Sequence, residues 1–298
     1  MLISAPYSLK RSVAIMFEKP QTKSHHDQEV ISWDMSSRGS TTSRIITEEP
    51  LSIRVQGKPY AVVMRTPGEE LNHVAGFCLG EGIVDNMSDI TALGFCDGAD
   101  TNVVTITLTE ARRTAVASYM DRRNYVSQTS CGICGKEIVD DLIQHIEPMV
   151  SKTIVDGRRA VDILENLKQY QPIHQQTRAS HASMLCHPDY SILSVSEDVG
   201  RHNALDKAIG RLFRSERLID ARVLLLSSRT SYELVQKAGR AQIPIVLSVS
   251  RPTSLAVSLA KKLGMTLACL CLLYTSPSPR DEQFHLVCRL LLEKGGGG

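Results

Sequence analysis

The chain has few aromatic residues, little net charge and no long apolar stretch. Phe, Trp and Tyr make up 5% of the 298 residues, and the net charge at pH 7 is +2. A nucleic-acid-binding surface needs a basic stripe or stacking aromatic side chains, and neither is present. No apolar run approaches the ~20 residues that span a bilayer, and the early charges near the N-terminus do not fit a secretory signal. We therefore expect no nucleic-acid or membrane partner.

The sequence also lacks a regular cysteine framework. Its eight cysteines are scattered and unevenly spaced. That pattern is typical of a reducing compartment rather than of a secreted protein held by disulfides, so we expect a cytoplasmic protein. The length suits one large domain or two small ones, each with room for a hydrophobic core.

The most informative segment is Cys-Gly-Ile-Cys-Gly at 131–135. Residues 136–146 predict a helix, because apolar residues recur there every four positions. Cys131 and Cys134 are therefore expected at or just before a helix N-terminus, whose partial positive charge lowers the pKa of a thiol. A thiolate beside a second thiol can attack sulfur, carry sulfur or bind a metal.

Three roles are open for this cysteine pair. A structural zinc site needs two more ligands, and no second Cys-x-x-Cys exists, although His145 and His181 could be recruited. A thioredoxin-like pair would directly follow a strand, whereas a polar, basic stretch over 121–130 precedes this one. Such a stretch is typical of a mobile surface loop, here 120–136. It fits a sulfur-carrying arm better than a dithiol oxidoreductase.

The first half of the chain predicts a disordered lead over 1–43 and a small α+β unit over 44–130. Alternating polar and apolar residues indicate strands at 51–55, 60–64 and 101–108. A helix is expected to begin after Thr66, because Thr66 and Glu69 have the spacing of a capping box and Pro67 suits the first helical position.

The second half, 137–270, predicts an α/β domain in which strands and helices alternate. The expected strands are 190–196, 222–227, 243–249 and 265–270, and the expected helices are 203–213, 231–240 and 253–263. Two of these strands are nearly continuous apolar runs, as expected for strands covered on both faces. The fold class predicted is therefore α/β (α+β overall), with a small N-terminal mixed unit followed by a βαβαβ three-layer domain.

Polar loops follow three of the predicted strands, and such loops gather at one edge of the sheet, where ligands bind. Each loop opens a helix and carries an arginine with small hydroxyl residues, which favours a phosphate or another anion. Ser and Thr there are also ordinary helix caps, and Thr230 and Glu233 have capping-box spacing. His181 lies just ahead of this block and is either structural or part of the same site. The candidate residues are Asp198, Arg201, His202, Asn203, Ser228, Arg229, Thr230, Ser231, Thr253, Ser254 and His181.

Three segments, 130–135, 197–207 and 227–238, together resemble the formate dehydrogenase accessory sulfurtransferase family. Weaker matches lie at 66–67, 76–83 and 252–256, and the likeness covers roughly residues 45–268. The resemblance implies a homodimer whose C-terminal part resembles the cytidine deaminase fold.

The resemblance also implies a sulfurtransferase activity. Such a protein takes persulfide sulfur from a cysteine desulfurase and passes it to bis-molybdopterin guanine dinucleotide, the molybdenum cofactor destined for formate dehydrogenase. Cys131 would carry the persulfide, and Cys134 would assist its transfer. The candidate residues at the sheet edge would hold the guanine dinucleotide as a bound substrate, with no intrinsic metal.

The chain departs from the family pattern in two places. Arg178 and Ser180 stand where small, glycine-rich residues are usual, and residues 271–298 read as a non-native tail. Two other functions compete. A cofactor-binding chaperone would need no cysteine pair, and a zinc-dependent nucleotide deaminase would need the His-x-Glu and Pro-Cys-x-x-Cys signature, which is absent.

Overall fold

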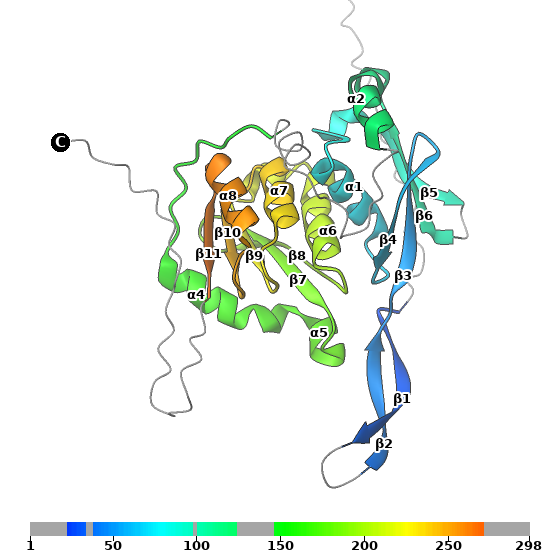
Figure 1. Ribbon diagram of the computed structural model, residues 1–298, viewed down its shortest axis with the longest axis vertical. Helices are drawn as coiled ribbons and strands as arrows, with labels where there is room; N and C mark the ends of the chain where they lie inside the picture. The colour runs from blue at the N-terminus through cyan, green and yellow to red at the C-terminus, as the bar shows by residue number, and fades with distance from the viewer. Residues whose placement is uncertain (1–22, 34–37, 98–99, 124–145, 271–298) are drawn as a thin grey trace, which may run out of the picture.

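The structure is a computed structural model that describes residues 23–33, 38–97, 100–123 and 146–270. Within these residues the chain forms three separate sheets with helices packed around two of them, as Figure 1 shows. The predicted mixed α/β fold class is confirmed. The cysteine pair, all but the last residue of the helix predicted over 136–146, and the tail lie outside the described residues.

The N-terminal unit is built on a four-stranded sheet with the strand order β4-β3-β6-β5. Leu51, Ile53 and Val55 alternate inward from β3 and are almost fully buried, which confirms the predicted strand pattern. The elements of this unit are β3 Glu49–Val55, β4 Lys58–Arg65, α1 Glu70–Gly80, η1 Met87–Asp89, β5 Ile90–Asp97, β6 Asp100–Leu108 and α2 Glu110–Arg123.

Helix α1 begins three residues later than a capping box at Thr66 would require, so that prediction is wrong. Its N-cap is Glu69, which has a left-handed backbone (φ 62°) and makes no side-chain cap bond. The Glu69 side chain instead pairs with Arg211 of the C-terminal domain. The capping-box spacing is present in the sequence, but both side chains bond to the other domain.

Residues 25–46 contradict the prediction that the lead over 1–43 is disordered. They form an antiparallel hairpin of β1 His25–Trp33 and β2 Arg38–Ile46, which extends away from the body of the molecule in Figure 1. No described residue of this hairpin is buried. Because neither face is apolar, the sequence lacks the polar–apolar alternation by which strands are recognised.

The C-terminal domain is a five-stranded mixed sheet with the order β11-β10-β9-β7-β8. β9, β10 and β11 are parallel, and β7 lies antiparallel between β9 and β8. Its elements are α4 Gly157–Glu165, η2 Asn166–Tyr170, α5 Pro172–Thr177, β7 His181–Cys186, β8 Ile192–Asp198, α6 Arg201–Arg214, η3 Leu218–Asp220, β9 Val223–Leu226, α7 Tyr232–Arg240, β10 Ile245–Ser248, α8 Ser254–Lys262 and β11 Thr266–Cys269.

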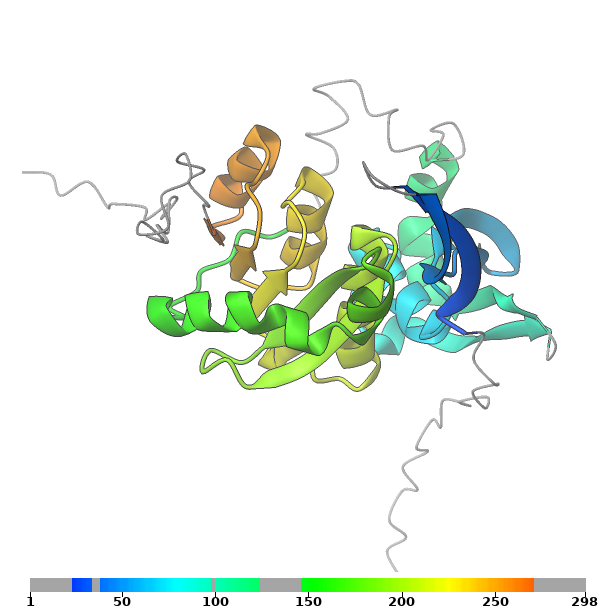
Figure 2. The same cartoon turned by 90° about the horizontal axis from the view of Figure 1, so that it is seen from below.

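Helices cover both faces of this sheet. Leu224 and Leu226 point into a core shared with α6, α7 and α8, while Val223 and Leu225 point into a second core with α4 and η2. Figure 2 shows the same three layers from below. The predicted βαβαβ arrangement of strands and helices is confirmed, and its likeness to the cytidine deaminase fold stays a prediction. No helix within the described ranges is long and apolar enough to cross a membrane.

The two units meet where α1 crosses α6. A Cβ atom added at Gly76 would lie 1.9 Å from the Asp206 carbonyl oxygen, and one added at Gly210 would lie 1.8 Å from the Asn72 carbonyl oxygen. Only glycine permits so close an approach of the two backbones. The crossing therefore fixes the N-terminal unit against the helix that leads into the candidate site.

Candidate functional site

The three polar loops lie at one edge of the five-stranded sheet, where β8, β9 and β10 end and α6, α7 and α8 begin. β7 runs the opposite way, so its first residue, His181, pairs with Asp198 at the same edge. The loops contact one another, because the Thr253 N–H donates to the Thr230 carbonyl oxygen at 3.0 Å. We call His181, these three loops and the first turns of α6, α7 and α8 the anion edge.

His202 joins the first turns of α6 and α7. Its Nε2 atom lies 2.8 Å from a carboxylate oxygen of Glu233 and 3.2 Å from the Ser231 hydroxyl. This hydrogen bond from His202 lowers the pKa of Glu233 against the opposing effect of burial. The capping box predicted from Thr230 and Glu233 is therefore wrong: Ser231 is the N-cap of α7 and makes no side-chain cap bond.

One arginine and two further histidines lie near His181. Burial lowers the pKa of His181, and the nearby Arg201, His174 and His202 lower it further, while Asp198 alone opposes them. The Nε atom of Arg201 is buried and has no hydrogen-bond partner among the described residues. An anion bound here would relieve the repulsion around His181 and could supply a partner for Arg201.

The remaining candidate residues differ in how accessible they are. Arg229 is exposed at the start of the β9–α7 connection, and Ser228 is buried beneath it, donating to the Arg229 carbonyl oxygen at 3.1 Å. Thr253 caps α8, because its hydroxyl accepts from the Ala256 N–H at 3.2 Å, and Ser254 is exposed beside it. Thr253 therefore serves as a helix cap, whereas Arg229 and Ser254 are free to face solvent.

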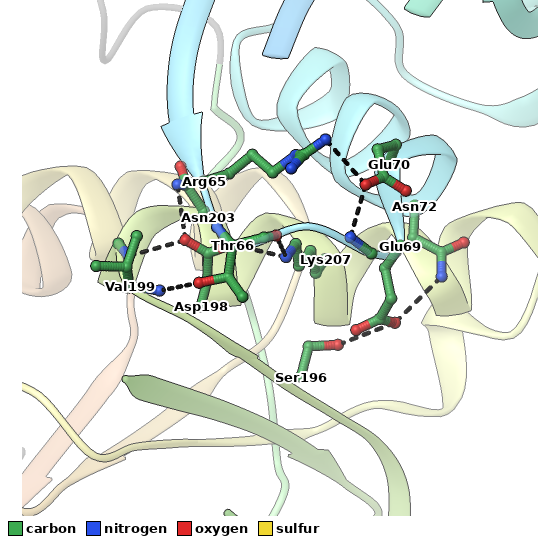
Figure 3. Close-up of polar contacts among 12 residues, drawn as sticks. Arg65, Thr66, Glu69, Glu70, Asn72, Ser196, Asp198, Val199, Asn203 and Lys207 are labelled. Carbon is green, nitrogen blue, oxygen red and sulfur yellow. Dashed lines mark hydrogen bonds and ion pairs between the residues drawn. The ribbon is translucent and has the colours of Figure 1, made fainter. Parts of the chain in front are cut away.

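Asp198 and Asn203 turn inward, toward the N-terminal unit, and their contact with a cofactor stays a prediction. The Asp198 carboxylate lies 2.6 Å from Lys207 Nζ, 3.0 Å from the Thr66 N–H nitrogen, 2.8 Å from the Gly200 nitrogen and 2.9 Å from Asn203 Nδ2. Figure 3 shows this cluster between the two units. Asp198 is fully buried, so its carboxylate is already saturated by the protein itself.

Glu197 and His174 belong to the edge although sequence reasoning did not select them. The buried Glu197 carboxylate accepts from the N–H groups of Ile173 and His174 at 2.8 and 2.9 Å and from the Ser180 hydroxyl at 2.7 Å. These bonds hold α5 against β8 and place His174 near His181. The available signal was the acidic residue at the end of a predicted strand, where a charge needs a partner.

The ends that flank the cysteine segment, 124–145, lie away from the anion edge. α2, which leads into that segment, is held near the C-terminal end of α1, where Arg112 donates to the Ile83 carbonyl oxygen at 2.8 Å. On its far side Ile146 packs at the last turn of α7, 3.3 Å from where a Cβ of Gly239 would lie. The first turn of α2 and Ile146 therefore both lie toward the last turn of α7, whereas the first turn of α7 belongs to the anion edge.

Metal ligands do not gather within the part of the chain that the structure describes. There, no group of three or more His, Cys, Asp or Glu side chains is arranged to hold an ion.

The chain belongs to the FdhD/NarQ family, whose model matches residues 46–272. Two curated relatives are each named "Sulfur carrier protein FdhD". The one from Streptomyces coelicolor is 38% identical over 233 residues, covering 75% of this chain and 82% of the relative. The one from Mycolicibacterium paratuberculosis is 39% identical over 232 residues, covering 75% and 85%.

A solved structure supports the fold independently. A crystal structure titled as a putative formate dehydrogenase accessory protein from Desulfotalea psychrophila matches with a TM-score of 0.66. It covers 83% of this chain and 93% of that one, at 21% sequence identity. At this identity the likeness shows the shared fold alone.

Proposed function

We propose that this protein is a cytoplasmic sulfurtransferase that carries persulfide sulfur from a cysteine desulfurase to the molybdenum cofactor of formate dehydrogenase. The observation that carries the proposal is the anion edge, where Arg201 and His202 of the first turn of α6 lie near His181 and Arg229 lies in the loop before α7. The relatives named as sulfur carriers supply the second support. Cysteine desulfurase and formate dehydrogenase are the proposed partners, and the proposed assembly is a homodimer.

The anion edge suits the pyrophosphate groups of bis-molybdopterin guanine dinucleotide, which is the substrate rather than a resident cofactor. Helix N-termini present free N–H groups and a positive partial charge to phosphate oxygens. Arg201 and Arg229 can each form paired, charge-assisted hydrogen bonds to the same groups. Ser231 and Ser254 lie at the first turns of α7 and α8, where their hydroxyl groups can donate to further oxygens.

The sulfur chemistry is assigned to the cysteine pair, which lies outside the described residues. The Cys131 thiolate attacks the terminal sulfur of the donor's persulfide, the donor leaves as a thiolate, and Cys131 becomes the persulfide. Attack by the Cys134 thiolate on the Cys131 sulfur then forms a disulfide and releases the terminal sulfur as hydrosulfide for the molybdenum. A dithiol reductant must restore the pair, so the electrons balance.

Removing either arginine of the anion edge should weaken nucleotide binding without affecting sulfur acceptance. A charge-assisted hydrogen bond contributes enough that Arg201→Ala or Arg229→Ala should lower the affinity for GDP about tenfold. Isothermal titration calorimetry with GDP, which carries the guanosine diphosphate portion of the cofactor, measures this. Arg217→Ala is the matched control, because Arg217 pairs with Asp220 after the end of α6. Unchanged affinity in both edge variants would contradict the anion site.

GDP affinity should also depend on the protonation of His181. Because the pKa of His181 is lowered, this side chain is neutral at pH 7 and becomes a cation only as the pH falls further. Lowering the pH from 7.5 to 5.5 should therefore favour GDP binding more in the wild type than in His181→Asn. His187→Asn, at the other end of β7, is the control. Identical pH profiles in all three proteins would contradict a role for the protonation of His181 in GDP binding.

A second function remains compatible with the same edge. A chaperone that binds and shields the molybdenum cofactor would use the anion edge but would not need a thiol that accepts sulfur. Uptake of labelled sulfur by Cys131 distinguishes the two functions, because only the sulfurtransferase requires it.

A further inference from the structure

All three polar groups of Thr66, a residue of the N-terminal unit, form hydrogen bonds with the C-terminal domain. Its N–H donates to the Asp198 carboxylate at 3.0 Å, and its carbonyl oxygen accepts from Lys207 Nζ at 2.7 Å. Its hydroxyl oxygen accepts from the Val199 N–H at 3.0 Å. The residue is fully buried, and Figure 3 shows it between the two units. Thr66 is therefore not a helix cap but a contact between the units.

These contacts end on the turn that presents the anion edge. Val199 and Gly200 connect β8 to α6, and Arg201 and His202 follow directly as the first residues of that helix. The turn packs closely against α6, because a Cβ added at Gly200 would lie 2.7 Å from the Asn203 amide nitrogen. The hydrogen bond that Thr66 accepts from Val199 thus holds the backbone two residues before Arg201 and three before His202.

The N-terminal unit supports the same turn at a second point. The Asn203 side-chain amide donates to the Met64 carbonyl oxygen at 2.7 Å and to the Asp198 carboxylate at 2.9 Å. Lys207 and Asp198 form an ion pair with almost no solvent exposure. A buried ion pair adds little net stability, because desolvation offsets the attraction, but losing one partner is strongly unfavourable. The cluster therefore favours one relative arrangement of the two units over others.

We propose that Thr66 is a positioning residue of the anion edge: the β4–α1 loop of the N-terminal unit sets the Val199–Gly200 turn and thereby aims Arg201 and His202 at the bound anion. This inference rests on the anion site of the proposed function and adds a requirement to it. The nucleotide site is complete only when the N-terminal unit is docked, although no residue of that unit needs to contact the ligand.

Two substitutions at Thr66 test the role of its hydroxyl group. Thr66→Val keeps the shape but removes the acceptor and leaves the Val199 N–H buried and unpaired, whereas Thr66→Ser keeps the acceptor. We expect Thr66→Val to lower the affinity for GDP about tenfold and Thr66→Ser to bind within about twofold of the wild type. Circular dichroism of all three proteins checks that the fold is retained. Equal affinity in Thr66→Val and the wild type would overturn the proposal.

A double-mutant cycle with Arg201 separates positioning from general destabilisation. If Thr66 acts through Arg201, Thr66→Val should weaken GDP binding much less in the Arg201→Ala background than in the wild type. Fully additive losses, or an equal loss in Thr66→Ser, would show a merely structural role and contradict the proposal.

Amide hydrogen exchange over residues 199–203 tests the turn without any ligand. Exchange should be faster in Thr66→Val than in the wild type and should be restored in Thr66→Ser. A wild-type protein that binds no GDP would contradict the anion site itself and, with it, the aiming of Arg201. The exchange result then still decides whether Thr66 holds the turn. Equal exchange in all three proteins would overturn the Thr66 contact.

Discussion

Cys131→Ala is expected to abolish the uptake of sulfur from a cysteine desulfurase while leaving GDP binding intact. The reason is chemical: only a thiolate attacks a persulfide, and the proposed carrier thiol would be gone. GDP affinity should stay within about twofold of the wild type, because distant and independent sites contribute additively. The measurement uses desulfurase and radiolabelled cysteine, followed by non-reducing gels and mass mapping of the labelled peptide.

The other described cysteines make this result specific. Burial raises the pKa of Cys186 to about 12 and also raises that of Cys78, so both are neutral thiols at pH 7. Cys269 is buried too, whereas Cys96 is exposed and free. Cys96→Ala is therefore the matched control and should accept sulfur normally. Label that survives in Cys131→Ala, whether on Cys96, on Cys134 or elsewhere, would show that Cys131 is not the required carrier. A wild type without label would favour the cofactor chaperone.

The C-terminal sheet could be predicted because its strands carry a local signal. The strands around Leu224 and Val246 are short apolar runs between amphipathic helices, and this pattern requires burial on both faces. β7 was missed because it starts with the polar residues around His181 and pairs antiparallel among parallel neighbours. The hairpin over 25–46 was missed because it has no apolar face. Local sequence patterns thus predict the helices and strands whose buried face is marked by regularly spaced or continuous apolar residues.

The anion edge could be predicted only in part, because contacts with residues far away in the sequence set the orientation of some of its side chains. The positions of Arg201, His202 and Arg229 at helix starts follow from the order of strands and helices. The inward turn of Asp198 does not, since its partner Thr66 is 132 residues away in the sequence. Around Thr66 and around Asp198, the residue types fit a ligand-binding role or a helix-capping role equally well. Only the packing of the two units decides between those roles.

The packing of those units depends on the glycines at the α1–α6 crossing, so Gly210→Ala is expected to destabilise the protein strongly. The added methyl group would lie 1.8 Å from the Asn72 carbonyl oxygen, and backbone atoms on both helices must separate to admit it. Overpacking of this kind costs about 1–3 kcal/mol and more where backbone must move, which exceeds the ~1 kcal/mol that alanine adds to a helix. Urea unfolding, followed by circular dichroism, measures the loss.

Gly157→Ala is the matched control for this substitution. Gly157 is also helical, but a Cβ there would meet no atom within 4 Å. Its variant should unfold at the same urea concentration as the wild type or a higher one. A Gly210→Ala protein of wild-type stability would show that α1 can shift along α6. The N-terminal unit would then not be held firmly enough for Thr66 to fix the turn before Arg201, so this measurement also tests the support on which the anion edge depends.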